Sequence, residues 1–164
     1  MSKTFTPDQD HSREFRDALG CFATGVTIVT AQTPDGPVGM TANSFSSISL
    51  TPPLVLWSPS KHSKRYPAFE HASHFCIHVL RDDQKDLALE FAKRGDAFDL
   101  VDWTLTETQT PVIQDCLTSF ECRTDAIHDG GDHVIVVGRV QTVRLNAGAP
   151  LIFTQSAYGG FSGT

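Results

Sequence analysis

Hydrophobic and polar residues follow a two-residue period over several short segments of the chain, and this pattern predicts β-strands. The clearest case is residues 74–80, where every second side chain is apolar. β-Branched residues dominate 26–31, and a Pro-Asp-Gly turn leads from there into a second apolar segment at 38–42. The first half of the chain is therefore expected to contain a β-hairpin and further strands.

The second half of the chain predicts longer strands. Two long segments, 117–127 and 133–145, are joined by the polar sequence His-Asp-Gly-Gly-Asp, which predicts a hairpin with a glycine-bearing tip. Shorter strands are expected at 48–50, 54–57, in the Thr-rich region between 98 and 111, and at 150–153. The Thr-Pro-Pro sequence between the first two of these predicts an edge or a bend.

Three segments have the spacing of amphipathic helices. The first is expected to have Ser12 as its cap and an apolar face of three residues, Phe15, Leu19 and Phe22. A short helix is expected around 68–71. The third is expected to span 84–93, with Asp82 or Asp83 as its cap.

These elements predict a mainly β protein. Six or seven strands, joined mostly by hairpins, have two or three helices inserted between them, and strict alternation of strand and helix is missing. An antiparallel barrel with helices at its mouth therefore fits better than a parallel sheet. Residues 1–12 are polar and are expected to form a flexible tail, and 13–164 are expected to form one domain.

Composition and charge narrow the class of protein. The chain has 164 residues, 40% of them hydrophobic, and a net charge of −6, so a folded domain is expected and nucleic acid is not expected as its partner. Because no apolar segment resembles a signal peptide or a membrane span, we expect a cytoplasmic protein without a membrane partner. The four cysteines form no CxxC pair and are expected to be reduced thiols, mainly in or near the core.

The stretch 39–58, GMTANSFSSISLTPPLVLWS, is the first candidate for a binding site. It places small hydroxyl and amide side chains between two apolar segments. Such residues add little to a core, but they offer hydrogen-bonding groups and close backbone approach to a ligand. Local composition alone fits a solvated Ser-rich loop equally well.

A basic loop follows directly. The sequence SPSKHSKR, residues 58–65, combines three hydroxyls with three permanent cations before a short helix. These groups and the amides at a helix start are the donors that hold a phosphate monoester. A solvated basic turn is the alternative.

The tip of the predicted long hairpin carries a third candidate, Gly131-Asp132-His133. Glycine allows close backbone approach, and the aspartate can orient the imidazole of the histidine toward a bound ring. Ordinary turn chemistry also explains this sequence.

Other chemistries have little support. Neither GxGxxG nor GxxxxGK[ST] is present, so a Rossmann fingerprint and a P-loop are excluded, as are GxSxG and HExxH. His74, Cys76 and His78 share one side of a predicted strand, but they lack convincing spacing and supporting carboxylates, so no metal site is expected.

Several motifs, in this order along residues 13–161, resemble the flavin reductase-like domain family. They are FRDALG with FATGVT (15–20 and 22–27), GMTANSFSSISLTPPLV (39–55), LALEFA (87–92), Gly131-Asp132-His133, and Pro150-Leu151 with Tyr158-Gly159. Members of this family are small NAD(P)H:flavin oxidoreductases of two-component monooxygenase systems.

The resemblance implies a split antiparallel β-barrel of the FMN-binding type, a homodimer, and binding of flavin near the subunit interface. It implies FMN or FAD and NADH or NADPH as ligands, and a partner monooxygenase that receives reduced flavin. The sequence leaves open which flavin and which nicotinamide dinucleotide are used.

The resemblance also assigns roles to particular residues. His133 with Asp132 behind it, and Gly131 at the same turn, would lie by the nicotinamide. The remaining assigned residues are Thr41, Ala42, Asn43, Ser44 and Phe45 along the flavin, Ser58, Lys61 and Ser63 near its ribityl chain and phosphate, and Phe91 near the flavin.

Two other functions remain open. A flavin-binding module or redox sensor without turnover would use the Ser-rich stretch and the basic loop equally well, and only Gly131-Asp132-His133 favours hydride transfer. A tightly held flavin that acts on another substrate or on oxygen is the second alternative.

Overall fold

The computed structural model describes residues 2–163 of the chain, and its main element is an antiparallel sheet of seven strands. The strands are β2 (Thr27–Thr33), β3 (Gly36–Ala42), β4 (Ser46–Leu50), β5 (Pro53–Trp57), β6 (His74–Val79), β9 (Thr118–Gly130) and β10 (His133–Leu145). Their order in the sheet is β3-β2-β6-β9-β10-β5-β4. The protein is therefore mainly β, as predicted.

Smaller elements surround this sheet. A three-stranded sheet is formed by β1 (Thr24–Gly25), β11 (Leu151–Thr154) and β12 (Ala157–Gly160), and a two-stranded one by β7 (Trp103–Leu105) and β8 (Pro111–Ile113). The helices are α1 (Ser12–Gly20), α2 (Tyr66–Glu70) and α3 (Lys85–Lys93), with 3₁₀ turns at Asp82–Gln84 and Ala97–Leu100. No helix among residues 2–163 has both the length and the apolar character needed to cross a membrane.

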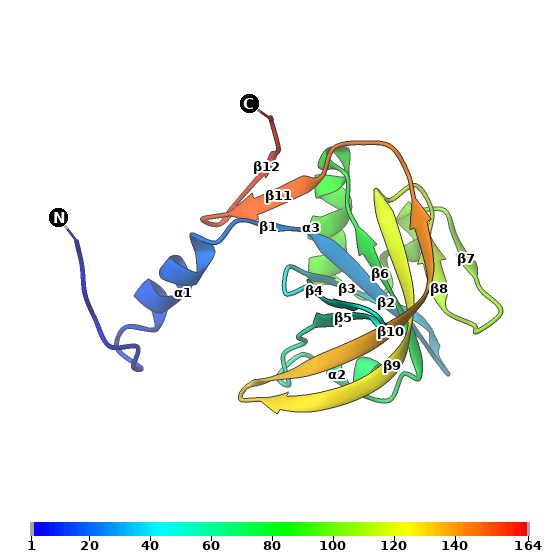
Figure 1. Ribbon diagram of the computed structural model, residues 1–164, viewed down its shortest axis with the longest axis horizontal. Coiled ribbons are helices and arrows are strands. Elements are labelled where there is room, and N and C mark those ends of the chain that lie inside the picture. The colour runs from blue at the N-terminus through cyan, green and yellow to red at the C-terminus, as the bar shows by residue number, and fades with distance from the viewer. Residues whose placement is uncertain (1, 164) are drawn as a thin grey trace.

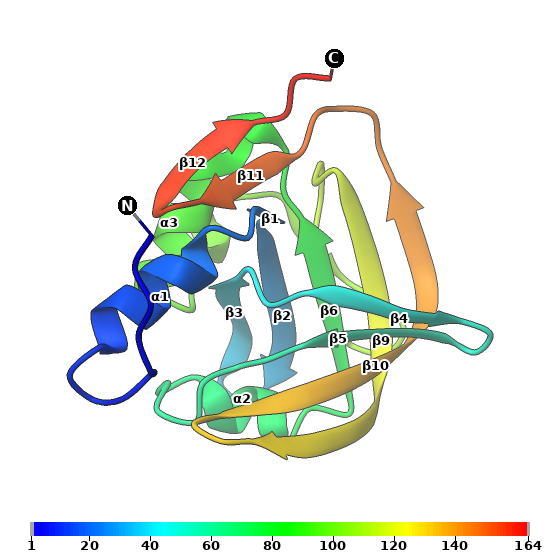
Figure 2. The ribbon, with the colours of Figure 1, turned by 60° about the vertical axis from the view of Figure 1, so that its left-hand side comes forward.

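The β9–β10 hairpin is the longest part of the sheet and is strongly bent (Figure 2). Its register shifts twice, between Val137 and Gly138 and between Val140 and Thr142. Such β-bulges increase the local twist and bend the strand that carries them. The bend carries the tip of the hairpin toward α2 and the loop that follows β5.

Two apolar clusters form the core. The first lies against one face of the central sheet and contains Trp57, which packs edge-on against Phe69 at a ring distance of 4.9 Å. The second lies between α3 and the strands beside it and contains Phe91, which packs edge-on against Phe98 at 5.2 Å. Three of the four cysteines are buried and all four are free thiols, as predicted, while Cys21 is exposed.

Several element boundaries differ from the prediction. Ser12 is the first residue of α1 rather than its cap, and the preceding His11 is held by the Asp8 carboxylate through its N–H at 3.0 Å and its ring. Asp82 and Asp83 form a 3₁₀ turn before α3 instead of capping it. Neither α1 nor α3 has a side-chain hydrogen bond at its N-cap, so the predicted capping role of these residues is wrong.

The C-terminal region also contains a strand that the sequence did not predict. β12 pairs with β11, and the turn between them places Gln155 and Ser156 at positive φ. Residues other than glycine rarely adopt this conformation, so turn propensities give no signal here. In the β9–β10 hairpin, pairing continues through Gly130, which leaves only Gly131 and Asp132 at the tip.

Helix α1 projects from the body of the protein (Figure 1). Phe15 and Leu19 lie on this helix as predicted, whereas Phe22 lies beyond its end, and no residue of the helix is buried: Phe15, Leu19 and Phe22 are 42%, 59% and 80% exposed. Only its C-terminal end is tied down, because the Gly20 carbonyl accepts hydrogen bonds from Gln155 N–H at 2.8 Å and from the Thr154 hydroxyl at 3.2 Å. An amphipathic helix in this position has its apolar face unpartnered within the described chain.

His78 is a fully buried part of the central sheet and joins three strands. Its Nδ1 lies 3.0 Å from the Ile28 carbonyl oxygen, and its Nε2 lies 3.0 Å from the Ile113 N–H. Because a carbonyl accepts and an N–H donates, Nδ1 carries the proton and the ring is neutral. Burial, which is the largest effect, lowers the pKa of His78 from 6.5 to about 4.

This geometry predicts a loss of stability in weak acid. In the unfolded chain His78 regains its ordinary pKa, so the unfolded state binds more protons between about pH 6.5 and pH 4. The contribution of His78 to the free energy of unfolding is complete above this pH window, and about 3 kcal/mol of it is lost as the pH falls through the window. Urea denaturation at several pH values should therefore show that the stability difference between wild type and His78→Gln shrinks toward pH 4.

The exposed His128 provides a matched control. His128→Gln should keep the pH dependence of the wild type. Equal pH dependence in wild type and His78→Gln would show that the ring is not held neutral in the fold.

Candidate functional site

Residues 41–45 form the end of β3 and the loop that leads to β4, at one edge of the central sheet. The Thr41 hydroxyl donates to the Ala88 carbonyl of α3 at 2.6 Å, and the ring of Phe45 stacks on Phe120 at 5.6 Å. Between them, Asn43 is exposed, and its side-chain amide has no hydrogen bond within residues 2–163. Thr41 and Phe45 therefore fix the loop, and Asn43 is available to a ligand.

The position of α3 beside this loop depends on a close backbone approach. A Cβ at Gly39 would lie 2.5 Å from the ring of Phe91, so only glycine fits there. The guanidinium of Arg65 donates to the carbonyls of Gly39 at 3.0 Å and Ala92 at 2.9 Å, and also to that of Phe91. Burial lowers the pKa of Arg65 from its ordinary value. Arg65 thus joins the end of α3 to β3 through backbone carbonyls.

Two cavities meet at Asn43. The first, of about 220 Å³, is lined by Thr41, Ala42 and Asn43 together with Ala92 and the aromatic pair Phe153 and Tyr158. The second, of about 260 Å³, continues past Asn43 and Phe153 to residues of α1 and to Thr24. The Thr24 hydroxyl is buried and has no hydrogen-bond partner within the described residues. This groove combines an aromatic wall with two polar groups that lack partners.

Ser44 connects the loop to the basic segment. Its hydroxyl accepts the Ser58 N–H at 2.9 Å and donates to the Ser58 carbonyl at 3.3 Å. Ser60, two residues further on, forms a β-bridge with His133, and the Val134 N–H donates to the Pro59 carbonyl at 3.2 Å. The loop at Ser44, the segment 58–60 and the start of β10 at His133 are distant in sequence, and they therefore follow one another along the same edge of the protein.

Lys61 fastens the basic segment to the tip of the long hairpin. Its backbone N–H donates to the Asp132 carbonyl at 2.9 Å, and its ammonium donates to the Gly131 carbonyl at 2.6 Å and pairs with the Asp129 carboxylate. The hydrogen bond from Lys61 lowers the pKa of Asp129. Gly131 has a φ of +78°, which glycine adopts without strain. Lys64, by contrast, is exposed and unpaired among residues 2–163.

His133 and Asp132 form a hydrogen-bonded pair at this tip. Nδ1 of His133 lies 2.7 Å from Oδ1 of Asp132, and this bond lowers the pKa of the Asp132 carboxyl. An ionised carboxylate only accepts, so Nδ1 carries the proton and Nε2 is left for another partner. The imidazole side chain is 43% exposed, so a ligand can reach it.

The structure brings most of the predicted site residues to one edge but gives some of them internal partners. Ser63 has a turn role, because its hydroxyl accepts the Arg65 N–H at 3.2 Å. Phe91 is fully buried beneath Gly39 and lines neither cavity. Its neighbour Ala92 reaches the first cavity instead.

Sequence reasoning missed part of the groove. Phe153 and Tyr158, with ring centroids 5.0 Å apart, and Thr24 come from the two ends of the chain. They meet because β1 pairs with β11, a pairing that local patterns do not reveal. Thr24 and Tyr158 each stood in a motif of the family resemblance, which was the one available signal.

The chain was compared with known proteins. Residues 19–162 match the family model for the flavin reductase like domain. FMN reductase (NADH) SmoA from Agrobacterium fabrum is 55% identical over 158 residues, covering 96% of this chain and 91% of that protein. The flavin-dependent monooxygenase reductase subunit HsaB from Mycobacterium tuberculosis is 40% identical over 152 residues, covering 90% and 81%.

A solved structure agrees with these relatives. The NADH:FAD oxidoreductase SgcE6 from Streptomyces globisporus, in complex with NAD and FAD fragments, superposes with a TM-score of 0.89 at 35% identity, covering 97% of this chain and 98% of that one. The chain belongs to the flavin reductase like domain family.

Proposed function

We propose that this chain is an NADH-dependent flavin reductase that supplies reduced flavin to a partner monooxygenase. The observation that carries this proposal is the placement of the groove at Asn43 and the His133–Asp132 pair on one edge, joined through Ser44 and Ser60. The relatives named as an FMN reductase (NADH) and as a monooxygenase reductase subunit support both the reaction and the partner.

The residues around Asn43 fit a flavin. A planar ring with polar edges needs a flat apolar wall and hydrogen-bonding groups in the plane. Phe153 and Tyr158 supply the wall, while the amide of Asn43 and the buried Thr24 hydroxyl supply groups without internal partners. Backbone amides at 43–45 then hold the carbonyl edge of the ring, and Ser58, Lys61 and Ser63 lie toward the phosphate end.

The chain contributes position rather than reactive groups. When bound, the flavin accepts a hydride at N5 from C4 of the reduced nicotinamide, which is chemistry that the two ligands supply themselves. The protein has to hold two rings about 3 to 3.5 Å apart. His133, oriented by Asp132, presents Nε2 to the nicotinamide carboxamide, while Gly131 leaves space for the ring.

The assembly is part of the same proposal. The strong bend of β9 and β10 supports a split β-barrel, and the exposed apolar face of α1, with Phe15, Leu19 and Phe22, supports a homodimer that covers it. Free thiols suit a reducing, cytoplasmic compartment. Residues 13–164 then form one catalytic domain.

A flavin-binding module without turnover is the alternative, and an anaerobic assay separates the two. Protein, FMN and NADH are mixed without oxygen, and the visible absorption band of the flavin is followed. We expect protein-dependent bleaching that is faster with NADH than with NADPH, because the relative with the highest identity given above is named for NADH. Binding of FMN without bleaching by either dinucleotide would favour the binding module.

His133→Ala should raise the apparent Michaelis constant for NADH by about tenfold or more, because one polar contact to the nicotinamide is lost. The dissociation constant of FMN, from flavin fluorescence titration, should change little. His128→Ala, which removes an exposed histidine of the same hairpin, is the control. An equal rise in the Michaelis constant for NADH and in the dissociation constant of FMN in His133→Ala would show that His133 supports the structure of the hairpin tip and does not bind the nicotinamide.

Lys61→Ala should weaken FMN binding by about tenfold or more while riboflavin, which lacks the phosphate, is affected much less. Lys64→Ala removes an exposed cation of the same loop and should leave both affinities nearly unchanged. Parallel weakening of FMN and riboflavin in Lys61→Ala would limit Lys61 to its contacts with Asp129 and Gly131 and place the phosphate elsewhere.

A further inference from the structure

A second polar cavity lies away from the flavin groove, near the opposite end of β10 from His133. Its volume is about 510 Å³, which is the range of small-molecule sites, and it separates the turn that joins β7 and β8 from strands β9 and β10. Thr104, Glu121, Gln141 and Arg144 are among its lining residues. None of these residues belongs to the proposed flavin or nicotinamide site.

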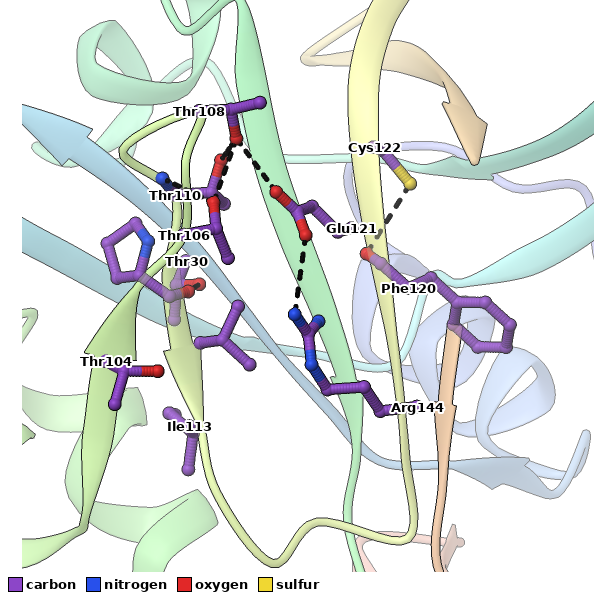
Figure 3. Close-up of polar contacts among 12 residues, drawn as sticks. Thr30, Thr104, Thr106, Thr108, Thr110, Ile113, Phe120, Glu121, Cys122 and Arg144 are labelled. Atoms are coloured by element: carbon purple, nitrogen blue, oxygen red, sulfur yellow. Dashed lines mark hydrogen bonds and ion pairs between the residues drawn. The ribbon is translucent and has the colours of Figure 1, made fainter. Parts of the chain in front are cut away.

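Glu121 is the centre of the cavity wall. Its side chain is only 7% exposed, and its Oε1 accepts a hydrogen bond from the Thr108 hydroxyl at 2.8 Å. Thr108 in turn lies 3.0 Å from the Thr106 hydroxyl and 2.8 Å from the Thr110 hydroxyl (Figure 3). Since Thr108 has one proton and donates it to Glu121, the other two threonines donate to Thr108. Oε1 is therefore fixed by a chain of hydroxyls.

The second carboxylate oxygen is less well satisfied. Oε2 of Glu121 lies 3.6 Å from Nη2 of Arg144, which is an ion pair but too long for a hydrogen bond. Nη1 of Arg144 is buried and has no hydrogen-bond partner within residues 2–163. Figure 3 shows the guanidinium approaching Glu121 from the neighbouring strand. Oε2 of Glu121 and Nη2 of Arg144 thus stand side by side, paired by charge but without a hydrogen bond between them.

A β-bulge adds a further group. Between Val140 and Thr142 the register of β10 slips by one residue, and the extra residue is Gln141, whose side chain lines the cavity. Bulges of this kind redirect a side chain and are common beside binding sites. The Thr104 hydroxyl accepts a hydrogen bond from the Gln114 amide at 3.2 Å, so its own proton remains available.

We propose that this cavity binds a small neutral polyhydroxylated molecule, of the sugar or sugar-alcohol class. A hydroxyl group both donates and accepts, so one hydroxyl can bridge Oε2 of Glu121 and Nη2 of Arg144, donating to the first and accepting from the second. Adjacent hydroxyls then reach Gln141 and Thr104. An anion fits less well, because the charge of Arg144 is already balanced by the buried carboxylate of Glu121, which would repel it.

The proposal predicts sugar binding at this cavity, detected by amide NMR. The ¹⁵N-labelled full chain is titrated with D-ribose, D-glucose and, as an anionic comparison, citrate. We expect saturable shifts at the amides of Thr104, Gln141 and Thr142 with at least one sugar, and a dissociation constant below about 10 mM. Absence of a saturable shift with both sugars, or stronger binding of citrate, overturns the proposal.

Arg144→Lys tests the geometry while keeping the charge opposite Glu121, and so the fold. It removes the second guanidinium nitrogen and should weaken sugar binding about tenfold or more. Arg139→Lys is the control, because Arg139 lies on the same strand but pairs with Asp125 outside the cavity. Unchanged affinity in Arg144→Lys, with an unchanged melting temperature, also overturns the proposal. FMN titrated into the same sample reports on residues near Asn43, so failure of the flavin assignment is seen separately.

Discussion

The pairing of β9 with β10 is the interaction on which the rest of the structure depends. β9 also pairs with β6 and β10 also pairs with β5, so this hairpin joins the two halves of the central sheet. Its bulges bend it, and the bend brings the tip with His133 to the segment that follows β5. A straight hairpin of the same length would place that histidine in solvent, away from the loop at Asn43.

Polar side chains at this edge fall into two groups, and the distinction decides which of them can bind a ligand. The side chains of Arg65 and Ser44 form hydrogen bonds with backbone groups, and these bonds hold α3 and the loops in place. Within residues 2–163, neither the Asn43 amide nor the Thr24 hydroxyl has such a partner. Because an unpaired buried polar group costs free energy, a partner for the buried Thr24 hydroxyl is expected from outside the chain, while the exposed Asn43 amide is free to bind a ligand. Residue type alone does not separate the two groups.

The sequence predicted the local elements well because their signals are local. The alternation at 74–80 and the hairpin after residue 33 follow from side-chain period and turn residues, and both are present. The candidate segments at 41–45 and 131–133, singled out for their glycine and small polar residues, lie along one edge of the structure, and their role in ligand binding stays a prediction. The pairing of β1 with β11 was not predicted, because it joins residues more than a hundred positions apart. Nor did composition indicate that Arg65 caps the end of α3.

The separate roles of the sheet and of its connecting loops follow from the reaction. Hydride transfer between two bound rings needs little beyond their alignment, so a small domain with few ionisable groups in its groove is sufficient. The rigid part is the sheet, and the groups proposed to contact ligands lie on its connecting loops, which are tied to one another by Ser44, Ser60 and Lys61. Each tie joins two of these segments, so the loop at Asn43 and the hairpin tip at His133 are held in fixed positions relative to one another. Alignment of the two rings is therefore a property of the network of loops, and no single residue determines it.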